Sequence, residues 1–167
     1  MAQIDPAKIG GWYEAHAPKL LLFVRQWLSF DAANDVVQDV FVQLIRQRKE
    51  PDNIRAWLFR VARNAVISRM RSRSRRQKRE TIVAERKPQW FEQKADDLVD
   101  AQMVTEHLQS ISSQQREVIV MRIWGGLTFD EIASVTESSK ATVFRRHRDG
   151  LQAIKEAMEK SCTKKTN

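Results

Sequence analysis

The chain has a single cysteine among its 167 residues, Cys162, which leaves no partner for an internal disulfide and excludes a cysteine-based zinc site. Glycine and proline are also scarce, at five and four residues, and strand-like alternation is hard to find. These shortages favour an all-α protein. No apolar run approaches the roughly 20 residues that span a bilayer. With no signal-peptide pattern at the amino terminus either, we expect a cytoplasmic protein without membrane insertion.

Acidic residues are missing from residues 55–79, which contain ten lysines and arginines. Surface helices normally mix the two signs because like charges one turn apart repel each other. A run of one sign becomes favourable beside a polyanion, and the net charge of +8 and the pI near 10.0 point the same way. We therefore expect this segment to bind nucleic acid rather than to be only a solvated face.

Two aromatic residues, Trp57 and Phe59, lie at the start of this basic segment. Aromatic side chains beside arginines suit stacking on unpaired bases. The helical spacing of Trp57 with Val61 favours a core position for Trp57, whereas stacking is the better interpretation of Phe59.

The pattern of apolar and charged residues predicts two small helical domains. Between them the composition changes to six acids against three bases, with Pro88 in the middle, as is typical of a linker. The predicted boundaries are a first domain over 7–79, a linker over 80–102, a second domain over 103–159 and a polar tail over 160–167.

The clearest amphipathic helix is predicted over 32–48, where apolar pairs recur every four residues up to Leu44 and Ile45. Its other face is acidic and amide-rich within a basic protein, and carries Asp35, Gln38, Asp39 and Gln43. This face is either simply solvated or a docking surface for a basic protein partner. A third hypothesis, a nuclease, would use Asp35 and Asp39 to hold a metal, but no His, further acid or phosphate-binding loop joins them. We expect no metal, cofactor or catalytic residue.

The stretch from Thr128 to Gly150 predicts a helix-turn-helix. Thr128 and Glu131 fit a capping box, "TESS" is the turn, and Ser139 caps the second helix. Such a second helix lies in the major groove of duplex DNA. Its candidate contacts to bases and phosphates are Ser139, Lys140, Thr142, Arg145, Arg146 and Arg148, with one arginine available to read guanine. Phe144 could contact a thymine methyl or, as is more ordinary, pack inward.

Three motifs in this order resemble the extracytoplasmic-function group of bacterial sigma factors. They are "ANDVVQDVFVQLIRQ", "NIRAWLFRVARNAVISRMRSRSRR" and the region-4 pair "LQSISSQQREVIVMRIWGGLTFDEIASV" and "SSKATVFRRHRDGLQAIK". The resemblance covers about residues 10–79 and 103–157 and implies a subunit that directs core RNA polymerase to promoters.

The resemblance implies a role for each surface. The face with Asp35, Gln38, Asp39 and Gln43 would dock on the clamp helices of the largest catalytic subunit, and the second domain would meet the flap of the second-largest. The −35 element would be read as duplex by the second helix of the helix-turn-helix. The −10 element and its unpaired bases would be bound by Asn53, Arg55, Trp57, Phe59, Arg60, Arg63 and Asn64.

The chain departs from the family pattern in the turn, where Thr136-Glu137-Ser138-Ser139 replaces the usual Leu-Gly-Ile-Ser. A glycine that tolerates a left-handed backbone and a buried apolar residue are thereby lost, so the turn is expected to be looser or differently shaped. An anti-sigma protein controls many relatives, though no residue of this chain identifies one. The alternative hypothesis is a stand-alone helix-turn-helix regulator that binds DNA without polymerase.

Overall fold

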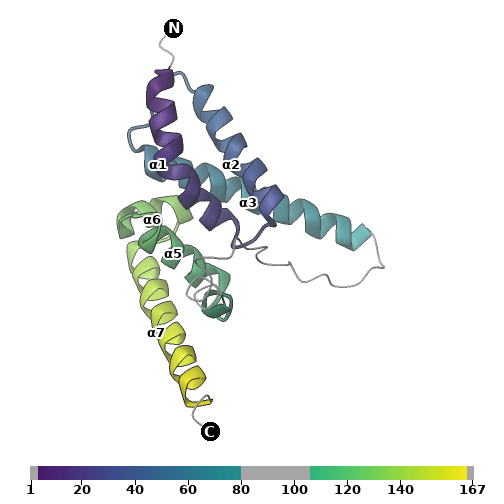
Figure 1. The fold of residues 1–167 in the computed structure, drawn as a ribbon, viewed down its shortest axis with the longest axis vertical. Helices are drawn as coiled ribbons and strands as arrows, with labels where there is room; N and C mark the ends of the chain where they lie inside the picture. Colours follow the sequence, from purple (N-terminus) through teal and green to yellow (C-terminus); the bar gives the residue numbers. More distant parts are fainter. Residues whose placement is uncertain (1–3, 80–105, 165–167) are drawn as a thin grey trace. The chain divides into compact units, whose positions relative to one another are not determined.

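The computed structural model describes residues 4–79 and 106–164, and every regular element in these two stretches is a helix (Figure 1). The chain divides into two compact units, Met1–Phe91 and Glu92–Asn167. The all-α, two-domain expectation is confirmed. The linker predicted over 80–102 lies outside the described residues.

The N-terminal unit consists of α1 (Pro6–Val24), α2 (Phe30–Ile45) and α3 (Ile54–Arg79), each of which packs against the other two. The predicted stripe on α2 is buried as far as Leu44, but Ile45 is 45% exposed. The helix also ends at Ile45 rather than at residue 48. The centre of the core is formed by Leu20, Phe23, Val36, Val40, Leu44, Leu58, Phe59 and Ala62.

Helix α3 has two different halves. Its start is capped by Asn53, whose side-chain oxygen accepts a hydrogen bond of 3.0 Å from the Ala56 backbone amide. The first half packs on α1 and α2 through buried apolar residues that end at Val66. Residues 70–78 are all exposed, and this end of the ribbon projects away from α1 and α2 (Figure 1).

The C-terminal unit contains α5 (Ser113–Ile123), α6 (Phe129–Thr136) and α7 (Lys140–Lys164). The predicted capping box of Thr128 with Glu131 is present, and a second capping box joins Ser112 with Gln115 at the start of α5. Ile123 is apolar but 53% exposed at the end of α5. The buried residues of this unit include Val118, Ile119, Val120, Met121, Leu127, Ile132, Val135 and Val143.

Helices α5 and α7 approach each other closely at Gly150. A Cβ atom at this position would lie 2.7 Å from Ile119 Cδ1 and 3.1 Å from Gln115 Cβ. Because these distances are shorter than ordinary van der Waals contact, a larger residue would force the two helices or their side chains to shift. Gly150 thereby helps to set the position of α7, the helix that carries the arginine cluster.

Candidate nucleic-acid interfaces and docking face

The four residues predicted to form a docking face, Asp35, Gln38, Asp39 and Gln43, are all exposed on α2. The periodicity of the helix places Asp35, Gln38 and Val42 along one line, opposite the buried stripe. Val42 is 42% exposed, so the face includes an apolar residue among its polar ones. Sequence reasoning missed Val42, although its spacing of three and four residues from Asp39 and Gln38 was a signal for it.

Asp39 is also tied to the basic helix. Its carboxylate lies 3.4 Å from the guanidinium of Arg69, which also donates a hydrogen bond of 3.5 Å to the Ala32 carbonyl. The Asp39 side chain is 64% exposed, so the ion pair is a weak tether between α2 and α3. A charge reversal at Asp39 would therefore disturb α3 as well as the docking face, whereas Asp35 offers a cleaner test.

Of the two aromatic residues of α3, Phe59 rather than Trp57 is the fully buried one. Phe59 has no exposed surface and contacts the Phe23 ring edge-on, with centroids 5.4 Å apart. Trp57 is partly exposed. The expectation that Phe59 stacks on bases is therefore wrong for this structure, because its ring is part of the core. Trp57 is the aromatic residue of this segment that remains accessible.

Arg60 and Asn64 are exposed on the same side of α3 as Trp57, because positions three and seven residues apart share a helix face. Arg63 is partly exposed beside them. We call Trp57, Arg60, Arg63 and Asn64 the outer face of α3. Of the other predicted residues, Asn53 serves as the helix cap.

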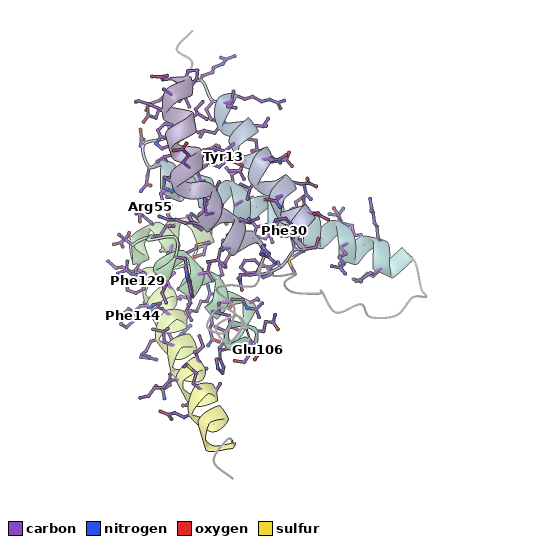
Figure 2. All side chains as sticks on the ribbon, viewed as in Figure 1. Tyr13, Phe30, Arg55, Glu106, Phe129 and Phe144 are labelled. Atoms are coloured by element: carbon purple, nitrogen blue, oxygen red, sulfur yellow. The ribbon has the colours of Figure 1, made fainter. Side chains whose placement is uncertain are left out.

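Arg55 lies beside α1 rather than among these residues. Burial of the imidazole lowers the pKa of His16, and the charges of Lys19 and Arg55 lower it further. Figure 2 labels Arg55 on the N-terminal unit. Arg55 is partly buried, so it is a less accessible contact than the exposed Arg60.

Helices α6 and α7 form the predicted helix-turn-helix. Ser139 caps α7, since its hydroxyl accepts a hydrogen bond of 3.1 Å from the Thr142 backbone amide and donates one of 2.9 Å to the Thr142 hydroxyl. Lys140 forms an ion pair of 2.8 Å with Asp130 at the start of α6. These contacts join the start of α7 to both the turn and α6.

The turn keeps a left-handed residue without a glycine. Glu137 follows α6 with φ of 53° and ψ of 39°, and it is the non-glycine residue with positive φ in the described part of the chain. Thr136 is buried and donates a hydrogen bond of 2.8 Å to the Ile132 carbonyl. The turn thus keeps the left-handed conformation at the position of the family's glycine, at the cost of backbone strain at Glu137.

We expect Glu137→Gly to stabilise the C-terminal unit by about 0.5–1 kcal/mol, because glycine removes the steric cost of the left-handed conformation. The measurement is the denaturant concentration at the midpoint of unfolding of this unit, and hydrogen exchange of the α6 amides is the probe that reports it. Ser134→Gly is the matched control: Ser134 is exposed inside α6, where glycine is expected to destabilise by a similar amount. Loss of stability in Glu137→Gly would contradict the assignment of strain to this residue.

The arginines of α7 point in different directions. Arg145 and Arg148 are exposed, and Arg148 also donates two hydrogen bonds of 2.9 and 2.8 Å to its neighbour Asp149. Arg146 is partly buried, and its guanidinium donates a hydrogen bond of 3.1 Å to the Ser138 hydroxyl. Arg146, predicted as a DNA contact, therefore holds the turn that precedes its own helix.

A cluster of rings surrounds Phe129 at the start of α6. Its ring is 5.5 Å from that of Phe144 and 5.2 Å from that of His147, both edge-on. Figure 2 labels Phe129 and Phe144 on the C-terminal unit. The Arg122 guanidinium lies over the same ring at 5.0 Å and donates a hydrogen bond of 2.9 Å to the Leu127 carbonyl. Burial, and then the charge of Arg122, lower the pKa of His147, so this histidine is neutral at physiological pH.

The fold and these surfaces define a protein with a basic helix in one unit and a helix-turn-helix in the other. Residues 12–76 match the model of sigma-70 region 2, and residues 101–154 match that of sigma-70 region 4. The chain belongs to the sigma-70 family, and within it to the extracytoplasmic-function sigma factors. It is a sigma factor that recognises promoters.

Curated relatives agree with this family. The chain is 25% identical over 169 residues to the extracytoplasmic-function sigma factor SigK of Mycolicibacterium vanbaalenii, which covers 95% of this chain and 85% of the relative. It is 24% identical over 166 residues to SigK of Mycobacterium tuberculosis, covering 94% of this chain and 89% of that relative.

Two solved structures share the fold. The sigma factor RpoE of Bartonella quintana, crystallised with the anti-sigma factor NepR, superposes with a TM-score of 0.72 and 22% identity, covering 91% of this chain and 97% of that one. The structure of CnrH with the cytosolic domain of CnrY gives a TM-score of 0.66 at 23% identity, covering 93% of this chain and 90% of the other. None of the described helices is long and apolar enough to cross a membrane.

Proposed function

We propose that the three surfaces divide the work of promoter recognition between the two units. The observation that carries the proposal is the outer face of α3, where Trp57 is accessible beside Arg60, Arg63 and Asn64. An aromatic ring among cations is suited to unpaired nucleotides. Every base offers a face on which the ring can stack, and every phosphate offers a negative charge to the cations. This face binds the −10 element, and the exposed arginines and lysine within residues 70–78 bind the adjacent DNA phosphates.

The start of α7 reads the −35 element as duplex DNA. Arg145 and Arg148 are exposed, and a guanidinium can bond to both acceptors of guanine in the major groove. Ser139 and Thr142 position the first turn of the helix, and Lys140 is 61% exposed despite its ion pair and is within reach of phosphate. We assign Arg146 to the support of the turn rather than to base contacts, because its guanidinium donates a hydrogen bond to the Ser138 hydroxyl.

The acidic and amide-rich face of α2 docks the chain on the clamp helices of core RNA polymerase, and the C-terminal unit binds the flap. Exposed carboxylates with the apolar Val42 beside them fit a partner surface that is basic and partly apolar. The chain acts in the cytoplasm, as a DNA-binding subunit rather than an enzyme. An anti-sigma protein is the controlling partner that we propose, since the structural neighbour RpoE was crystallised with one.

The test is transcription by bacterial core RNA polymerase with the full chain on a library of randomised promoters. The RNA products that depend on the chain should share two short upstream elements at a constant spacing. Permanganate should modify thymines in the downstream element, because they are unpaired. In parallel, the chain should be captured with core polymerase from solution.

The stand-alone regulator predicts a different result. In that case the isolated chain would select one DNA site, usually a palindrome bound by a dimer, and polymerase would neither bind it nor change the selection. Capture of polymerase without any selected element would contradict the DNA-binding roles of α3 and α7 while leaving the docking role of α2 intact.

A further inference from the structure

Phe144 is 52% exposed on α7, one of the large apolar side chains with the most exposed surface in the described residues. An exposed phenyl ring leaves apolar area in water that a partner would gain by covering. The inward packing that the sequence favoured is thus only partial: the ring lies 5.5 Å from that of Phe129, centroid to centroid, yet the residue remains 52% exposed.

The ring lies on the side of α7 that faces away from the core. From Ala141 to Gly150, the buried or partly buried positions are Thr142, Val143, Arg146, His147 and Gly150. Ala141, Phe144, Arg145 and Arg148 are all exposed, and their spacing of three, four and seven residues places them on one face. A duplex that meets Arg145 and Arg148 in its major groove therefore also meets Phe144.

The position of the ring is held by its surroundings. Phe129 supports it edge-on at 5.5 Å, and Phe129 is itself held between the His147 ring and the Arg122 guanidinium. The ion pair of Lys140 with Asp130 joins the start of α6 to the start of α7 and so keeps Phe129 beside Phe144. A side chain held in place before binding loses little conformational entropy on contact with DNA.

We propose that Phe144 reads the 5-methyl group of a thymine in the −35 element. The methyl group is the apolar feature that distinguishes thymine in the major groove, and phenylalanine is a side chain that contacts it. The inference rests on the proposed function and deepens it, because it assigns an apolar contact to a helix whose other outward contacts are cationic. The −35 element should accordingly contain a thymine next to a position read by Arg145 or Arg148.

The experiment uses the full chain assembled with core RNA polymerase and the −35 element selected from the promoter library. Each thymine of that element is replaced in turn by uracil, which removes only the methyl group. One replacement should weaken binding by the wild type about three- to five-fold, the effect of one buried methyl. The same replacement should leave binding by Phe144→Ala unchanged, which is the signature of a direct contact in a double-mutant cycle.

Met158→Ala is the matched control, because Met158 is a 45% exposed apolar residue on the same helix, four turns further along. It should keep the full response to uracil. Equal responses to uracil in the wild type and Phe144→Ala would overturn the inference and move Phe144 to a protein interface. A selected element without thymine would overturn it too, with the proposed function intact. If no upstream element is selected, the proposed function fails and this inference fails with it.

Discussion

Phe59→Ala should destabilise the N-terminal unit by about 3–5 kcal/mol, the usual cost of deleting a fully buried phenyl ring. Phe59 has no exposed surface and packs against Phe23 between α1 and α3, so its removal leaves a cavity in the centre of the core. The measurement is hydrogen exchange of α2 amides, which reports the opening of this unit separately from the C-terminal one.

Trp57→Ala is the matched variant on the same helix, two residues away. Its side chain is partly exposed, so we expect a cost in stability of about 1 kcal/mol or less. Promoter opening should instead be lost, seen as weaker permanganate reactivity of the −10 thymines with polymerase binding unchanged. If Phe59→Ala were stable but unable to open promoters, the core assignment of Phe59 would be refuted and the original stacking interpretation restored.

Asp35→Arg should weaken binding to core RNA polymerase by about 2–4 kcal/mol, or roughly 30- to 1,000-fold, because it places a cation against a basic surface. Asp35 is exposed on α2, opposite the buried stripe, so helix formation and packing should not change. The affinity is measured by titrating labelled chain with core polymerase, and the helical circular dichroism spectrum verifies the fold.

Glu14→Arg provides the control for charge, since it makes the same change at an exposed position of α1 in the same unit. It should bind polymerase within a factor of about three of the wild type, the small effect expected of a surface charge away from the interface. Equal losses in both variants would show that net charge, rather than the α2 face, governs the affinity. Unchanged affinity in Asp35→Arg would place the docking surface elsewhere.

Features that depend on residues near one another in sequence could be predicted well. The Thr128 capping box and the Ser139 cap follow from side chains that reach amides three residues away. The helix-turn-helix and the acidic face of α2 follow from periodicity in the same way. The three family motifs added the partners and the promoter elements, which composition alone does not name.

The places of individual side chains were decided by packing between helices. Trp57 and Phe59 both begin the same basic helix, and only the position of Phe23 on α1 makes Phe59 the buried one. Arg146 looked like its neighbours Arg145 and Arg148 in sequence, yet the return of the turn brings Ser138 within 3.1 Å of it. Ile123 and Ile45 are exposed because they lie at the ends of helices, beyond the packed surface.

The sequence by itself determined the class of protein, the helices and the charge of each surface, because these follow from local chemistry and from motifs with fixed spacing. Only the tertiary structure decided which side chains of those helices remain available to a partner. A helix has one side that packs, and the direction of that side at a given residue depends on contacts with segments far away in the chain. The exposed ring of Phe144 and the buried ring of Phe59 are the two clearest consequences.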